Sequence, residues 1–145
     1  MDALADTSLL VSVYSLDKLS PVACAAFRAH ETGAFAITTF HRLEFFNALR
    51  LRVFRGEISE QQLEQSIEDW ESDVADDILR DTPVELEHVY HRARLLSINH
   101  TRTVGMRSLD LLQVAAALEL HVKYFYSLDD RQRKVAAAEK LKVRP

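Results

Sequence analysis

The pattern of apolar and polar residues predicts short strands that alternate with helices. The strands are short apolar or β-branched runs, too brief to form helices. They span residues 3–5, 35–38, 78–79, 123–126 and 142–144. Between them, longer segments carry apolar residues at helical spacing. This alternation predicts an α/β fold in which helices cover both faces of a parallel sheet of four to five strands.

Capping residues mark where the predicted helices begin. Gly33 and Gly56 follow two of these helices and favour their ends. Residues 99–105, rich in Thr and Arg, are predicted to form a loop. The first or capping residues of the helices are Asp6 or Ser8, Ser20-Pro21, Thr38 or Thr39, Ser59 with Gln62, Thr82 with Glu85, Ser108, and Asp129 or Asp130.

Length and composition indicate one globular domain over residues 1–145. The chain is 48% hydrophobic and 28% charged, and its single cysteine, Cys24, cannot form an internal disulfide. No run approaches the ~20 apolar residues of a membrane span, and no basic segment typical of a signal peptide opens the chain. We therefore expect a cytoplasmic protein without a membrane anchor. The net charge of −4 argues against a broad basic surface for nucleic acid, although a local basic rim remains compatible with it.

Four acidic residues occupy positions where a sheet of this kind gathers its active site. Asp6 follows the first predicted strand, Asp129 follows the fourth, Asp110 lies in the first turn of the helix between them, and Glu44 flanks an apolar helix stripe. Taken singly, each aspartate is explained as a helix N-terminal acid, and Glu44 as a solvated side chain. Taken together, the four are expected to converge at the carboxyl edge of the sheet.

Carboxylates that converge in one cleft repel each other, so they cannot all ionise without a counter-charge. A divalent cation supplies that charge, and all-oxygen ligands favour Mg²⁺ or Mn²⁺. Such an ion can activate water and stabilise the charge that develops on a phosphodiester. The four acids therefore point to a metal-dependent nuclease.

Several segments resemble the PIN domain, and in particular the VapC-type toxin nucleases. They are Asp6-Thr7-Ser8 after the first strand, LEFFNAL around Glu44, RSLDLLQVAAAL around Asp110, and SLDDRQRKVAAAEKLKV at the end. The resemblance covers essentially the whole chain and implies a three-layer α/β/α fold and a metal-dependent ribonuclease that cuts single-stranded RNA. It also implies catalytic and metal-binding roles for Asp6, Glu44, Asp110 and Asp129, a supporting polar role for Ser8, and a cognate antitoxin protein as partner.

Other enzyme classes fit the sequence less well. A haloacid-dehalogenase-like phosphatase requires a second aspartate two positions after the first, and Ser8 stands there. His41, His88, His91 and His121 lack the spacing of a zinc site and are expected on helix surfaces. No glycine-rich phosphate loop is present. The remaining alternative is a non-catalytic α/β interaction module that dimerises and binds a partner peptide, with its acids serving only as helix caps.

Basic and aromatic side chains suggest where partners bind. Arg102, Arg107, Arg131 and Arg133 flank the segment around Asp110 and Asp129 and are the candidate RNA-binding residues. Four large apolar residues on two consecutive helices exceed what one compact face needs to bury, so part of them is expected to form a groove for an amphipathic partner helix. An arginine of that partner would pair with the acidic site. A homodimer is also expected. The four apolar residues are Phe45, Phe46, Phe54 and Trp70.

Overall fold

A computed structural model describes the whole chain, Met1–Pro145, and contains a central sheet of five parallel strands. The strand order is β3-β2-β1-β4-β5. The α/β class and all five predicted strands are confirmed. The strands are β1 (Ala3–Ala5), β2 (Phe35–Ile37), β3 (Leu79–Asp81), β4 (Tyr124–Tyr126) and β5 (Lys142–Arg144).

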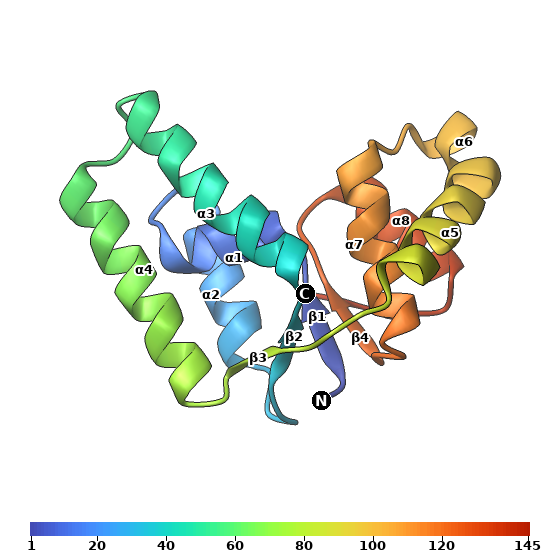
Figure 1. Ribbon diagram of the computed structural model, residues 1–145, viewed down its shortest axis with the longest axis horizontal. Coiled ribbons are helices and arrows are strands. Elements are labelled where there is room, and N and C mark those ends of the chain that lie inside the picture. The colour runs from blue at the N-terminus through green and yellow to red at the C-terminus, as the bar shows by residue number, and fades with distance from the viewer.

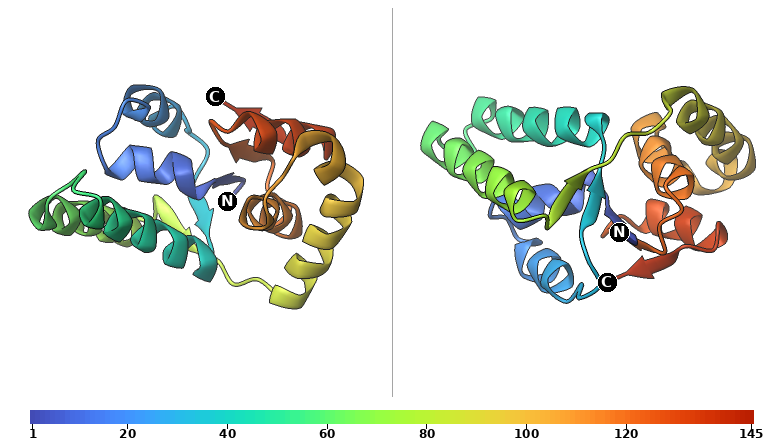
Figure 2. Two further views of the ribbon diagram at one scale, coloured as in Figure 1. Left: turned by 90° about the horizontal axis from the view of Figure 1, so that it is seen from above. Right: turned by 60° about the horizontal axis from the view of Figure 1, so that its bottom comes forward.

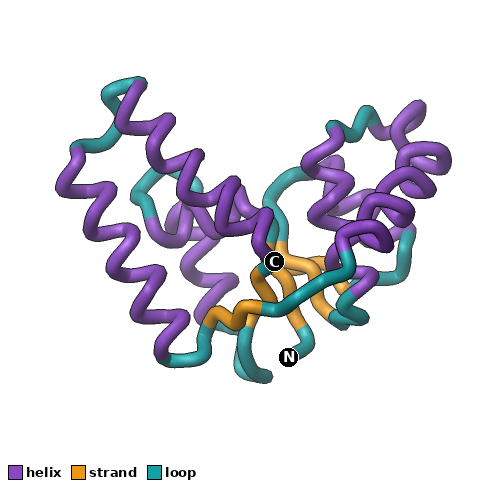
Figure 3. The backbone as a smooth tube through the Cα atoms, in the orientation of Figure 1, coloured by secondary structure: helices purple, strands orange, loops and turns teal.

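The helices form two groups, one on either side of the sheet (Figures 1 and 2). Helices α1 to α4 make up one group and α5 to α8 the other, with the strands between them (Figure 3). This is the expected three-layer α/β/α arrangement. The helices are α1 (Thr7–Tyr14), α2 (Ser20–Arg28), α3 (Thr39–Phe54), α4 (Glu60–Ala75), α5 (Leu86–Leu96), α6 (Arg102–Val104), α7 (Ser108–Glu119) and α8 (Asp130–Ala138). No helix is both long and apolar enough to cross a membrane.

The central strands β1 and β4 contribute to both layers because successive side chains point to opposite faces. Ala3 and Ala5 pack into the core beneath α1 to α4, whereas Leu4 packs into the core beneath α5 to α8. Likewise, Tyr126 packs into the core beneath α1 to α4, and Phe125 packs into the core beneath α5 to α8. Strands that are buried on both faces need continuous apolar runs, which is why β1, β2 and β4 could be recognised in the sequence although they are short.

The two cores are built from different side chains. The core beneath α1 to α4 is aromatic: the rings of Phe45 and Trp70 stack with centroids 4.1 Å apart, and Tyr14 meets Phe45 edge to face at 5.6 Å. The core beneath α5 to α8 contains many alanines, which let α5 and α7 pack closely. These alanines are Ala93, Ala115, Ala116, Ala117 and Ala136.

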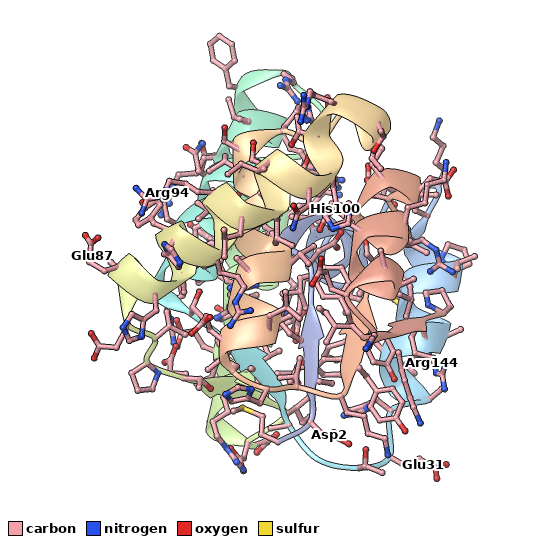
Figure 4. All side chains as sticks on the ribbon, turned by 90° about the vertical axis from the view of Figure 1, so that its right-hand side faces the viewer. Asp2, Glu31, Glu87, Arg94, His100 and Arg144 are labelled. Atoms are coloured by element: carbon pink, nitrogen blue, oxygen red, sulfur yellow. The ribbon has the colours of Figure 1, made fainter.

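The predicted loop at residues 99–105 is wrong. Helix α5 continues through a π-helical turn, Ser97–Thr101, into the short helix α6. The helical path ends at Gly105, whose φ of 75° is the left-handed conformation that glycine adopts readily. A hydrogen bond between His100 Nε2 and Glu139 Oε1, 2.7 Å long, joins the turn to the residue that ends α8 (Figure 4 labels His100). Tertiary contacts thus keep helical a segment whose composition favours a loop.

Two predicted caps also need correction. Helix α5 begins at Leu86 with Glu85 before it, and Thr82 plays no part in its start. Ser108 is the first residue of α7, and Arg107 precedes it in the capping position without a side-chain cap. The capping box of Ser59 with Gln62 is confirmed.

Candidate functional site: four carboxylates at the switch point of the sheet

The strand order reverses direction between β1 and β4. From β1 the chain builds outward to β2 and β3 on one side, and then returns to add β4 and β5 on the other. In open α/β sheets, ligands bind outside the carboxyl ends of the strands at such a switch point. Asp6 directly follows β1, and its backbone N–H donates to Tyr126 O at the end of β4, 2.9 Å away. Asp2, which precedes β1, lies at the opposite end of the sheet together with Glu31 (Figure 4).

Asp6 is fully buried, and both of its carboxylate oxygens accept hydrogen bonds. Oδ1 accepts from the backbone N–H of Leu9 at 2.7 Å, so Asp6 caps α1. Oδ2 accepts from Ser127 Oγ at 2.6 Å and from Ser8 Oγ at 3.1 Å. Burial raises the pKa of Asp6 to about 6, the three hydrogen bonds oppose that rise, and the charge of Asp129 adds to it. At neutral pH, Asp6 is an anion in an environment that disfavours its charge.

Glu44 approaches from α3 and is half-buried. Its Oε2 accepts a hydrogen bond from Thr7 Oγ1 at 3.0 Å and another from the Gln113 side-chain amide. The same amide nitrogen donates to Thr7 Oγ1 at 2.6 Å. Burial raises the pKa of Glu44, these hydrogen bonds lower it, and the negative charge of Asp110 raises it further.

Asp110 and Asp129 lie nearer the solvent, on the side of α7 and α8. Gln132 contacts both, because its side-chain amide donates to Asp110 Oδ1 at 3.3 Å and its backbone N–H donates to Asp129 Oδ1 at 2.9 Å. Arg107 Nε donates to the other oxygen of Asp110 at 3.2 Å. Ser127 Oγ accepts from the Asp129 backbone N–H at 3.0 Å. Ser127 thus joins Asp129 to Asp6, as Gln132 joins it to Asp110.

The structure brings all four predicted acids to one edge of the sheet. Their all-oxygen donor set has the chemistry that Mg²⁺ or Mn²⁺ requires. No three acidic, histidine or cysteine side chains are close enough together to hold a metal ion as they stand. The acids therefore fit such an ion in chemistry, and binding would require them to close around it.

Several polar residues of this site were not predicted from the sequence. Ser127 and Gln132 connect pairs of acids, Thr7 and Gln113 donate to Glu44, and all four are buried. Gln113 could have been recognised because it is the one polar residue in the apolar run LLQVAAAL. The expectation that His41 lies on a helix surface is wrong, because it is fully buried.

The four predicted RNA-binding arginines differ in how free they are. Arg102 and Arg107 are exposed, and Arg107 is the one that contacts an acid of the site. Arg131 is exposed and donates to Gly105 O at 3.2 Å. Arg133 is partly buried and donates to Ser127 O at 2.8 Å and to Pro145 O at 3.0 Å, contacts that stabilise the fold.

The expected groove of four large apolar side chains is largely filled by the fold itself. Phe45 and Trp70 are fully buried, and Phe46 packs against the same core. Phe54 remains 87% exposed at the end of α3. The apolar excess in these two helices is therefore mainly core, because an aromatic core needs several large rings on one face.

The fold defines the class of protein that the chain resembles. It is a PIN-like α/β/α fold, the class expected from the sequence motifs. The chain is similar to the crystal structure of Mycobacterium tuberculosis VapC20, a toxin that cleaves the sarcin–ricin loop, with a TM-score of 0.69, 15% identity and 99% of each chain covered. No protein-family model and no curated protein sequence matches it. At this identity the likeness establishes the fold.

Proposed function

We propose that the protein is a divalent-metal-dependent endoribonuclease that acts as the toxin of a type II toxin–antitoxin pair. The observation that carries the proposal is the contact network that joins Asp6, Asp129 and Asp110 at the switch point of a PIN-like sheet, with Glu44 close enough to feel the charge of Asp110. Acids that served only as helix caps would have no reason to meet there.

The four carboxylates would hold Mg²⁺ or Mn²⁺, and that ion would supply charge for the phosphodiester and an activated water. The chain's own residues prepare the site. Ser127 and Ser8 orient the buried carboxylate of Asp6. Gln132 keeps Asp110 and Asp129 on the same side of the opening. Burial of Asp6 makes its charge costly without a cation, which favours binding of one.

RNA is the proposed substrate because the similar VapC20 is a toxin that cleaves the sarcin–ricin loop. A net charge of −4 leaves no general attraction for a polyanion, so phosphates would bind at a local basic rim. Arg107 is the best-placed member of that rim, with Arg102 and Arg131 beside it. Arg133 would support the rim through its backbone contacts.

The proposed protein partners are a cognate antitoxin and a second copy of the chain. A pocket of about 310 Å³ lies beside Ser8 between α1 and α3, and its lining includes Leu51, Arg52 and Arg55. With Phe54 exposed at the end of α3, this surface suits an amphipathic partner helix. An arginine from that helix could pair with the acids.

The test is cleavage of a mixed RNA pool by purified protein with Mg²⁺, Mn²⁺ or chelator. Wild-type protein should cut the RNA only when the metal is present, and Asp6→Asn should not cut it at all. In cells, wild-type protein expressed alone should arrest growth, whereas Asp6→Asn should be harmless and still bind the antitoxin. RNA that stays intact with either metal, together with normal growth, would favour the non-catalytic interaction module.

A further inference from the structure

Gln113 is a buried polar side chain in the apolar middle of α7. It is 2% exposed, and the four residues after it are fully buried and apolar. Its amide nitrogen donates one hydrogen to Thr7 Oγ1 and the other to Glu44 Oε2. The Thr7 hydroxyl donates to that same oxygen of Glu44. The three side chains therefore form a ring of hydrogen bonds in which Glu44 Oε2 accepts from both Gln113 and Thr7.

His41 lies on the side of the Gln113 amide oxygen, Oε1. Its Nδ1 accepts from the backbone N–H of Thr38 at 3.3 Å and lies 2.8 Å from Thr38 Oγ1, a hydroxyl that can donate to it. Because a backbone N–H can only donate, Nδ1 carries no proton and Nε2 carries it. His41 Nε2 and Gln113 Oε1 are both buried, and neither has a hydrogen-bond partner in the structure. The Gln113 side chain lies near enough to raise the pKa of His41 against the effect of burial. Burial lowers the pKa of His41 to about 3, so the ring stays neutral at neutral pH.

This arrangement fixes which way the Gln113 amide faces. A flipped amide would place its oxygen against the Glu44 carboxylate and its NH₂ against the Nε2–H of His41. Both contacts would be repulsive, and buried donors and acceptors would lose their partners. The neutral imidazole thus selects the orientation in which the NH₂ group faces Glu44. With Oε2 occupied by two donors, Oε1 of Glu44 has no protein partner.

We propose that Gln113 is a positioning residue for Glu44, that His41 sets its orientation, and that the two present Oε1 of Glu44 to the bound cation. This inference rests on the proposed metal-dependent function. It assigns a role to two residues that touch neither the metal nor the RNA. Thr38, at the carboxyl end of β2, begins the relay by fixing the tautomer of His41.

The first test replaces Gln113 with methionine, which has a similar size and cannot make these hydrogen bonds. The affinity of the metal-free protein for Mn²⁺ is measured by electron paramagnetic resonance, alongside kcat, KM and thermal unfolding. Outer partners of metal ligands typically change affinity or activity by about 10- to 100-fold. We expect the Mn²⁺ affinity and kcat of Gln113→Met to decrease by about 10- to 100-fold, with KM for RNA unchanged.

A matched pair of variants at His41 isolates the role of its donor. His41→Gln places an amide N–H where Nε2 lies and should retain most of the Mn²⁺ affinity, whereas His41→Phe fills the space without a donor and should behave as Gln113→Met does. The double variant His41→Phe/Gln113→Met should be no weaker than Gln113→Met alone, because both changes remove the same contact. In nitrogen-15 NMR spectra, the wild type should show a slowly exchanging proton on Nε2 of His41, and Gln113→Met should lose its protection.

Each result decides for or against the inference. Wild-type Mn²⁺ affinity in Gln113→Met, or equal affinities in His41→Gln and His41→Phe, would overturn it. Effects that multiply in the double variant would do the same. A wild-type protein that binds Mn²⁺ but leaves RNA intact would remove the proposed function, and the affinities of the variants would still decide the positioning role. A wild-type protein that binds no Mn²⁺ would overturn both.

Discussion

The two sides of the sheet supply two different kinds of acid to one site. The aromatic side, α1 to α4, supplies Asp6 and Glu44, which are buried or half-buried and whose pKa values burial raises. The alanine side, α5 to α8, supplies Asp110 and Asp129, which are partly exposed, unlike the fully buried Asp6. Arg107 contacts Asp110, whereas no cation contacts Asp6 or Glu44 in the structure. The charge that the proposed metal ion would neutralise is thus least compensated on the aromatic side.

This difference follows from how each side is packed. Large stacked rings fill the space beneath α3, whose acid Glu44 is half-buried against Thr7 and Gln113, and Asp6 is covered because it begins a helix that is itself buried. Small alanines bring α5 and α7 together closely, so the acids at the start of α7 and α8 remain at the rim. Burial of an unpaired charge costs free energy, and partial exposure to water reduces that cost. The same four carboxylates can therefore serve one ion while contributing very differently to stability.

The largest expected effect separates the two kinds of acid. Asp6→Asn and Asp110→Asn should each reduce RNA cleavage by more than roughly 100-fold, since changes in outer partners alone reach that range. Without metal, only Asp6→Asn should raise the melting temperature, because it removes a buried anion while asparagine can still cap α1. Cleavage assays and thermal unfolding in chelator test this. Equal stabilisation by both variants would show that the two sides do not differ as described.

The next effect concerns the aromatic core beneath α3, the helix that carries Glu44. Phe45→Ala should destabilise the protein by about 3–5 kcal/mol, because it removes a fully buried ring that stacks on Trp70. Phe54→Ala, at the exposed end of the same helix, is the matched control and should change stability by less than about 0.5 kcal/mol. Denaturant unfolding measures both changes. A small loss in Phe45→Ala would mean that the aromatic side is not a packed support.

A third effect is the pH dependence that Asp6 contributes. Its folded pKa of about 6 lies above the usual 3.8, so between these values the folded state binds more protons than the unfolded state. Stability from this group is present below pH 4 and is lost as pH rises through 6. A shift of about two pKa units corresponds to about 3 kcal/mol.

Asp6→Asn isolates this contribution from that of His41, whose lowered pKa acts in the opposite direction. In metal-free protein, the stability difference between Asp6→Asn and wild type should be about 2.4 kcal/mol larger at pH 7.5 than at pH 4, where part of the full effect is already lost. Urea unfolding at both pH values gives the difference. A constant difference would mean that Asp6 is not the buried anion of the site. Mg²⁺ or Mn²⁺ should reduce the difference at pH 7.5 by binding to the wild type.

The sequence predicted the fold well because its signals are local. The inner strands β1, β2 and β4 were recognisable because both of their faces are buried, and three of the four acids stood beside strand ends or helix starts. The relay through His41 and Gln113 was not predictable, because it joins residues more than 70 positions apart. The π-helical turn was missed for the same reason: contacts such as His100 with Glu139 override a composition that favours a loop. The number of aromatic residues could not reveal which of them the core would enclose.

The smallest expected effect concerns the side from which RNA approaches. Arg107 is on the alanine side, and its side chain is 75% exposed beside Asp110. A phosphate of RNA can therefore reach the guanidinium of Arg107 next to the acidic site. In the inactive Asp6→Asn background, Arg107→Glu should weaken RNA binding and reduce the salt slope of log K by about 0.7–0.9, the loss of one phosphate contact. Arg28→Glu is the matched control: Arg28 is exposed at the end of α2, near the start of β2, on the aromatic side and away from the acids. Its salt slope should equal that of the background protein. If Arg28→Glu lowered the slope as much as Arg107→Glu, RNA would be responding to net charge alone, and neither side of the site would be its entrance.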